Sequence, residues 1–148
     1  MKEEYNQLKK KLNLPDFEKL DSEFEISAVE QKEFLLRSIR KKITEKLVGF
    51  TEIFEEILQP EKPSTMYESN FISENERKAI FEIYKRLMYL IRLSEETSIG
   101  EDDKKDTDFI NRALNEWLLL KENIEEALSK MKEAWTKQLK KEEEAYFG

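Results

Sequence analysis

The chain has 148 residues, which is enough for one domain and leaves little room for a second. Charged residues make up 40% and hydrophobic residues 39%, with only three Gly and three Pro. This composition excludes in practice a β-sandwich or barrel and favours a chain that is nearly all helix. No Cys and no His occur, which excludes a disulfide framework, thiolate metal sites and the commonest catalytic base. We expect one all-α domain over residues 1–148, with no cofactor and no metal.

The charge and the apolar pattern also limit where the protein acts. A formal net charge of −7 argues against general attraction to nucleic acid or to an anionic membrane. No apolar run approaches the roughly 20 residues that a membrane helix needs, and residues 1–12 are rich in Lys and Glu where a signal peptide is apolar. We therefore expect a cytoplasmic protein without a membrane partner.

Two short amphipathic helices are expected near the N-terminus, over about residues 2–12 and 16–24, because apolar residues recur there at helical spacing. Each is too short to be stable alone in water, so both should pack on one end of the body within residues 1–26. Four side chains should therefore be buried: Phe17, Leu20, Phe24 and Ile26.

The first long helix is expected over residues 27–58. Ser27 and Glu30 have the spacing of a capping box, in which each side chain bonds the other residue's backbone N–H. Apolar residues then recur at intervals of seven: Leu36, Ile43, Phe50 and Ile57. Residues 59–72 follow, with two prolines and four large apolar side chains, and are expected to form a packed loop.

Two more long helices are expected, over residues 73–98 and 106–144. Ser73 and Glu76 form a second capping-box pattern, and Asp106 or Thr107 is the expected N-cap of the last helix. The last helix has the strongest periodicity of the chain, again at intervals of seven: Ile110, Trp117, Ile124 and Met131. The sequence thus predicts an antiparallel, up-down-up three-helix bundle.

Carboxylates are the only plentiful acid or base groups, so a carboxylate-metal enzyme is the enzyme class to consider. Glu52 and Glu55 match half of a magnesium motif of helical nucleotide pyrophosphatases, but the matching Glu-x-x-Asp is missing because no Asp occurs between Asp21 and Asp102. The acidic turn at 101–108 lacks the order of an EF-hand loop. We therefore expect these acids to be solvated helix surface and caps, and the protein not to be an enzyme.

A basic cluster forms the first candidate site. In an antiparallel bundle Arg40, Arg92 and Arg112 fall at similar heights on three helices, and further cations lie close by in sequence. The candidate anion- or partner-binding residues are Arg37, Arg40, Lys41, Arg86, Arg92 and Arg112. Such an arginine band could bind phosphate, an RNA backbone or an acidic partner; the opposing interpretation is that these cations pair with neighbouring acids.

The second candidate site lies where the helix lengths do not match. The last helix should overshoot the preceding one by about 13 residues, or about 20 Å, and carry apolar side chains beyond the body. The candidate interaction surface comprises Trp135, Leu139, Met66, Tyr67 and Phe71. Either the connection 59–72 packs against Trp135, or two copies of the chain cover each other in a homodimer. Trp117, in the middle of the apolar stripe, should be core.

These observations favour a non-enzymatic helical protein that acts in protein–protein interaction or as a scaffold, with an unknown partner or with itself. The alternative is an RNA- or phosphate-binding helical module that uses the arginine band.

Overall fold

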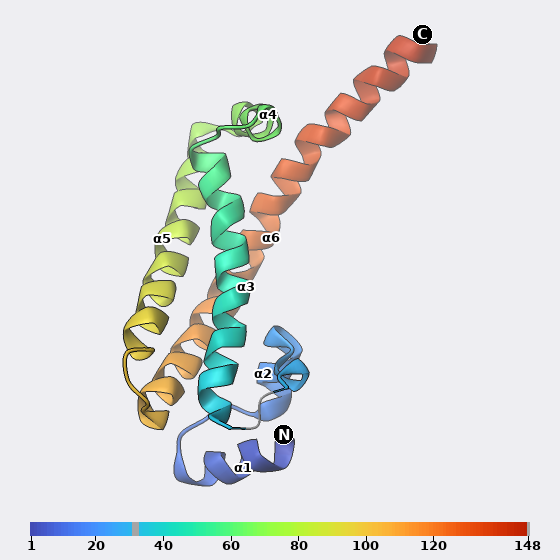
Figure 1. Ribbon diagram of the computed structural model, residues 1–148. Coiled ribbons are helices and arrows are strands. Elements are labelled where there is room, and N and C mark those ends of the chain that lie inside the picture. The colour runs from blue at the N-terminus through green and yellow to red at the C-terminus, as the bar shows by residue number, and fades with distance from the viewer. Residues whose placement is uncertain (31–32, 148) are drawn as a thin grey trace. The chain divides into compact units, whose positions relative to one another are not determined.

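The computed structural model describes residues 1–30 and 33–147, and the described chain is all-helical (Figure 1). The expected all-α class is thus confirmed. Among the described residues the helices are α1 (Lys2–Lys11), α2 (Phe17–Phe24), the 3-10 helix η1 (Ile26–Ala28), α3 (Leu35–Leu58), α4 (Pro63–Phe71), α5 (Glu74–Thr97) and α6 (Asp103–Phe147). None of the described helices has the length and hydropathy of a membrane span.

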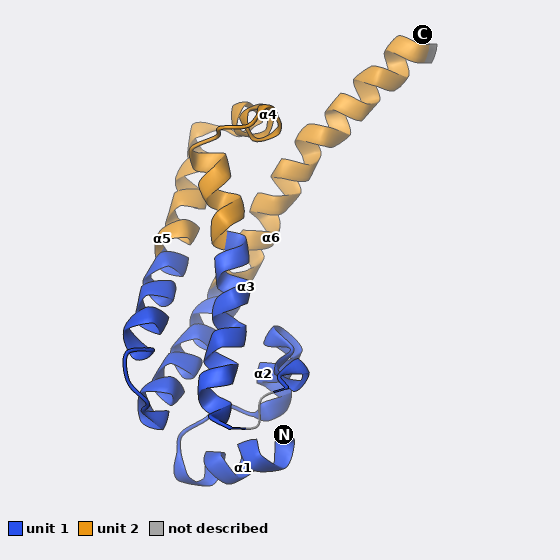
Figure 2. Ribbon diagram, viewed as in Figure 1, with its two compact units in different colours: residues 1–50, 86–119 blue, residues 51–85, 120–148 orange. Residues whose placement is uncertain are grey.

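The chain divides into two compact units (Figure 2). Unit 1 comprises Met1–Phe50 and Arg86–Leu119, and unit 2 comprises Thr51–Lys85 and Leu120–Gly148. Each of α3, α5 and α6 therefore contributes one part of its length to each unit. The expectation of a single domain stays a prediction.

The two short N-terminal helices belong to unit 1 and lie close to their predicted bounds. The prediction that the apolar side chains of this segment are buried is confirmed for all of Phe17, Leu20, Phe24 and Ile26. Glu25 ends α2 in the left-handed conformation, with φ of 54°. Tyr5 of α1 is also buried, because its ring packs edge-on to Phe17 and its hydroxyl donates to the Pro15 carbonyl at 2.5 Å.

The start of α3 differs from the prediction. The helix begins at Leu35, not near residue 28. The capping box of Ser27 and Glu30 does not cap it, because Ser27 lies in η1 and donates its backbone N–H to the Asp21 carboxylate at 2.8 Å. Phe34, directly before the helix, is left-handed with φ of 55°, a strained conformation for a bulky residue that cannot continue a helix backwards. Residues 31 and 32 lie outside the described residues.

The start of α6 also differs, by one turn. The helix begins at Asp103, because the carboxylate of Asp102 accepts the Lys104 N–H at 2.9 Å and so caps it. The predicted caps, Asp106 and Thr107, instead lie inside the helix and are buried. The helix has 45 residues against 24 in α5, so the difference in length exceeds the predicted one.

The connection over residues 59–72 is not a loop, because most of it forms α4 in unit 2. Pro63 occupies the first turn of this helix, where its missing N–H costs nothing. The Lys62 backbone N–H donates to the Thr65 hydroxyl at 3.3 Å. Pro63, which the sequence pattern marks as a helix breaker, therefore begins a short helix.

The capping box at the start of α5 is confirmed. The Ser73 N–H donates to the Glu76 carboxylate at 2.9 Å, and the Glu76 N–H donates to the Ser73 hydroxyl at 3.1 Å. The first of these bonds lowers the pKa of Glu76 because it stabilises the charged carboxylate, and Lys130 of α6, 3.7 Å away, acts in the same direction.

Candidate functional site

The candidate surface predicted from the last helix lies within unit 2, on α4 and α6. We call it the ledge: Met66, Tyr67, Phe71, Trp135 and Leu139. Tyr67 holds it together, because its ring centroid lies 4.9 Å from that of Trp135 and its hydroxyl donates to the Ala134 carbonyl at 2.9 Å. The prediction that the connection packs against Trp135 is thus confirmed.

The packing leaves much of the ledge uncovered. Trp135 is 39% exposed, Met66 49% and Leu139 61%. Phe71 is half-buried and lies under the Lys137 ammonium, 4.9 Å from the ring centroid. Trp135 is therefore held by one neighbouring ring and is still partly in solvent.

From Leu139 of the ledge onward, α6 continues in unit 2 with every described side chain exposed, as far as Tyr146. This end of the helix carries Lys137, Lys140 and Lys141 first and then three glutamates, Glu142 to Glu144. Side chains that stay this exposed add little burial to the stability of the helix, so the segment has surface to offer for packing.

The arginine band predicted for unit 1 does not form one exposed patch, because Arg40 is buried. Its Nε donates to the Asp106 carboxylate of α6 at 2.7 Å, and its Nη1 donates to the carbonyl and hydroxyl oxygens of Ser94 of α5 at 3.2 and 3.0 Å. The Thr44 hydroxyl lies 2.8 Å from that of Ser94. Arg40 therefore joins three helices through a buried polar network.

The other candidate cations of unit 1 are mostly occupied by neighbours. Three arginines lie in ion pairs: Arg37 with Glu101 at 3.3 Å, Arg86 with Glu116 at 2.8 Å and Arg92 with Glu95 at 2.6 Å. The Arg112 guanidinium lies 4.7 Å from the ring centroid of Tyr89, and Lys41 is exposed. The structure thus brings these residues to acids and rings rather than to one another.

A second buried polar group in unit 1 surrounds Trp117, which is core as predicted. Its indole N–H donates to the Glu23 carboxylate at 2.8 Å. The rings of Phe24 and Phe50 pack on it at 5.9 and 5.6 Å between centroids. The Lys46 ammonium lies 4.6 Å from the indole centroid and donates to the Glu23 carbonyl at 2.5 Å.

The sequence analysis missed the buried acids Glu23 and Asp106, although the pattern held a signal for both. Glu23 follows Leu20 by three positions, and Asp106 precedes Ile110 by four, so each lies in the register of an apolar stripe. Arg40 likewise falls between Leu36 and Ile43 at spacings of four and three. A charged residue at a position of the apolar stripe is therefore expected to be buried with a hydrogen-bonding partner, as Arg40, Asp106 and Glu23 are.

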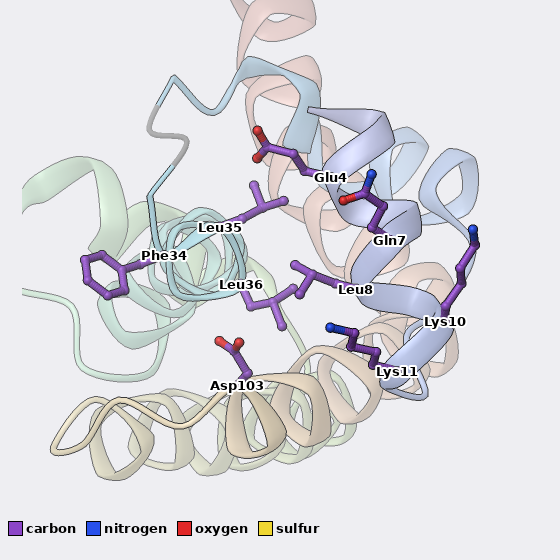
Figure 3. A pocket seen from close by; sticks show the side chains of 9 residues that line it. All are labelled: Glu4, Gln7, Leu8, Lys10, Lys11, Phe34, Leu35, Leu36 and Asp103. Atoms are coloured by element: carbon purple, nitrogen blue, oxygen red, sulfur yellow. The ribbon is translucent and has the colours of Figure 1, made fainter.

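A hollow of about 600 Å³ in unit 1 lies between α1, the start of α3 and the start of α6 (Figure 3). Figure 3 shows Leu8 of α1 pointing toward Leu36 of α3, with Phe34 on the far side of α3. The charged residues that line the hollow sum to zero net charge, because Glu4 and Asp103 stand against Lys10 and Lys11. The hollow therefore favours neither an anion nor a cation.

Among the described residues no three acids cluster closely enough to hold a metal ion. Glu52 and Glu55 are exposed on α3, and Asp102 serves as the cap described above. Comparison of the chain with protein-family models, with curated proteins and with solved structures found no match.

Proposed function

We propose that this chain is a non-enzymatic helical protein that acts through protein–protein interaction, and that the ledge of unit 2 is its binding surface. The observation that carries the proposal is the ledge itself: the Tyr67 ring of α4 packs on the Trp135 ring of α6, yet Trp135 and, one turn further on, Leu139 stay exposed, as does Met66 of α4. Burying apolar surface contributes about 25 cal/mol of free energy per Å² removed from water. A helix of another chain that covers the ledge would therefore bind favourably.

The end of α6 supports a second copy of the chain as the first partner to test. Lys137, Lys140 and Lys141 precede Glu142, Glu143 and Glu144, so two such segments in antiparallel order place the basic half of each against the acidic half of the other. Leu139 lies near the centre of this pairing and Trp135 toward one end. Complementary charge order of this type fixes orientation in helix pairs.

The proposal includes the finer architecture and the location predicted from the sequence. An antiparallel up-down-up arrangement of α3, α5 and α6 is supported in unit 1 by Arg40, which contacts both α5 and α6. In unit 2 it is supported by Arg77 of α5, which donates to the Ile57 carbonyl of α3 at 3.3 Å. We propose a cytoplasmic location on the composition, which lacks Cys. RNA or phosphate binding is not proposed, because Arg40 is buried and Arg37, Arg86 and Arg92 lie in ion pairs with glutamates.

The test compares two exposed leucines of the same helix. Leu139→Glu places a charge in the ledge, whereas Leu119→Glu places the same charge on an exposed part of α6 in unit 1. We expect the wild-type mass measured by light scattering to rise with concentration from 17.8 kDa toward the dimer. Leu139→Glu should stay at the monomer mass, and Leu119→Glu should behave as wild type.

If the wild-type protein is monomeric at every concentration, a second copy is not the partner, and affinity purification from the native host then tests the ledge. Proteins recovered with wild type and with Leu119→Glu but lost with Leu139→Glu would support binding at the ledge. Recovery of the same proteins by all three would overturn the proposal.

A further inference from the structure

A groove on unit 2 lies apart from the ledge, between the last turns of α3 and the first three turns of α5. Its volume is about 560 Å³. Leu58 and Gln59 line it from the end of α3, and Phe81 and Tyr84 line it from α5. Neither the predicted interaction surface nor the arginine band includes any of these residues.

The groove has an apolar side that is open to solvent. Phe81 is 48% exposed, and its ring stacks on Tyr84 of the next turn, with 6.3 Å between centroids and an interplanar angle of 22°. Leu58 and Tyr84 are half-buried. An exposed, ordered phenylalanine beside two half-buried apolar side chains offers an anchor point for an apolar side chain of a partner.

Arg77 fixes the shape of the groove and is not available to a ligand. Its guanidinium donates to the Ile57 carbonyl of α3 at 3.3 Å and to the Ser69 carbonyl of α4 at 2.8 Å. These carbonyls belong to helix ends that lack intrahelical partners. The arginine therefore ties three helices together at the base of the groove and leaves its walls to other side chains.

The walls are acidic. Glu55, Glu74 and Glu82 line the groove, and a second hollow of about 260 Å³ shares Glu55 and Gln59 with it and adds three further glutamates: Glu52, Glu56 and Glu61. Against these six acids stand Arg77, Lys78 and Lys62, an excess of three negative charges.

Two of the six glutamates have ion-pair partners: Glu56 with Lys62 at 3.7 Å and Glu82 with Lys85 at 2.5 Å. Within the described part of the chain, no ion pair involves Glu52, Glu55, Glu61 or Glu74. An excess of carboxylates along one groove is mutually repulsive, and a cationic ligand relieves this repulsion.

We propose that this groove binds a cationic amphipathic helix of a partner protein. Apolar side chains on one face of that helix contact Phe81 and Leu58, and Lys or Arg on the flanking positions contact Glu55 and Glu74. The acidic walls repel the phosphates of nucleic acid, so the partner is a protein. The proposal is independent of binding at the ledge, because the two surfaces share no residue.

The test uses a dye-labelled peptide of about 18 residues, five helical turns, built from Leu at i, i+3, i+4 and i+7 and Lys elsewhere. A scrambled peptide of the same composition is the control for the ligand. Binding to the full-length protein is measured by fluorescence anisotropy. We expect the amphipathic peptide to bind and the scrambled peptide to bind at least about tenfold more weakly, because only the first gathers its leucines on one helical face.

Variants matched in net charge locate the binding. Glu55→Lys with Glu74→Lys should weaken the affinity about tenfold, since two attractive contacts become repulsive. Glu122→Lys with Glu126→Lys reverses two exposed glutamates of α6 that line neither hollow, and should change the affinity less than about twofold, the change expected from long-range charge screened by salt.

Phe81→Ser tests the apolar anchor, with Tyr89→Ser as its control on an exposed aromatic of the same helix in unit 1. The first should weaken binding and the second should not. Equal weakening by both charge-reversal pairs would show attraction to the whole acidic chain rather than to the groove, and would overturn the proposal. An effect of the groove glutamates without an effect of Phe81 would also overturn it, because the ligand would then not be amphipathic.

Discussion

Trp117 and Trp135 lie on the same helix, 18 residues apart, and both lie in the same apolar stripe. Their surroundings differ. In unit 1, Trp117 is 4% exposed, under two phenylalanine rings, with its indole N–H bonded to Glu23. In unit 2, Trp135 is 39% exposed and packs against the single ring of Tyr67.

The difference follows from what else the chain supplies. α2 brings Phe24 and Glu23 to Trp117, whereas α4 brings one aromatic ring to Trp135. Helical periodicity thus marks which face of α6 is apolar, and separate segments decide how completely that face is covered. One tryptophan is part of a core, and the other is part of the surface for which we propose a partner.

The largest effect should come from Trp117→Ala. Loss of a buried tryptophan leaves a cavity and removes the donor to Glu23, so the free energy of unfolding should fall by about 4–5 kcal/mol. Urea denaturation followed by circular dichroism measures it. A loss no greater than that of Trp135→Ala would remove the contrast between the two sites.

Asp106→Ala should cost about 3 kcal/mol, because it leaves the buried Arg40 guanidinium without its carboxylate. The control is Glu95→Ala, which breaks the exposed pair with Arg92 and should cost less than about 1 kcal/mol. The double change of Arg40→Met with Asp106→Leu should recover most of the loss. Equal losses in Asp106→Ala and Glu95→Ala would show that the buried network adds nothing.

Trp135→Ala should lower the stability of the monomer by about 1–2 kcal/mol, since a large part of the ring is already in water. The measurement is urea denaturation at concentrations where light scattering shows monomer. If the free energy of unfolding did not change, Tyr67 would not pack on the Trp135 ring in the dissolved protein. The description of the ledge as ordered would then be wrong.

Glu76→Gln should have the smallest effect, about 0.5 kcal/mol near neutral pH. The pKa of Glu76 is lowered below the ordinary 4.5, so its charged form stabilises the folded state above that value and loses this contribution as the pH falls through the folded pKa. Wild type should therefore lose its advantage over the variant in acid. A difference that stays constant from neutral to acid pH would contradict the assigned capping role.

The sequence predicted the helices well where the signal was local and repeated. The stripes located α3, α5 and α6, and the capping box of Ser73 and Glu76 marked the start of α5. The same pattern at Ser27 and Glu30 failed, because Asp21, six residues earlier, takes the Ser27 N–H. A competing acceptor supplied by the preceding helix is invisible to a four-residue pattern.

The two candidate sites were predictable only in part, again because a local sequence pattern does not show which residues meet in space. Apolar residues in the connection indicated that it packs, and Tyr67 does pack on Trp135. The similar heights of Arg40, Arg92 and Arg112 stay a prediction, but Arg40 is buried and cannot belong to an exposed arginine band, because height along a helix does not say which face a residue lies on. The position of Arg40 between Leu36 and Ile43 already placed it on the buried side of α3. A comparison with the apolar stripe would therefore have predicted a buried Arg40 and an exposed Arg92.

The network around Arg40 also bears on how the helices of unit 1 choose their alignment. Apolar residues that repeat every seven positions pack almost equally well after a slide, so the stripes alone discriminate weakly between registers. A slide of α3 by one repeat of seven residues, about 10.5 Å, would carry Arg40 away from Asp106 and Ser94 and leave two opposite charges buried apart. Separating the buried pair therefore costs more free energy than the pair contributes in the correct alignment. The charged residues of this core thus favour one alignment of the helices over others that bury the apolar stripes almost equally well.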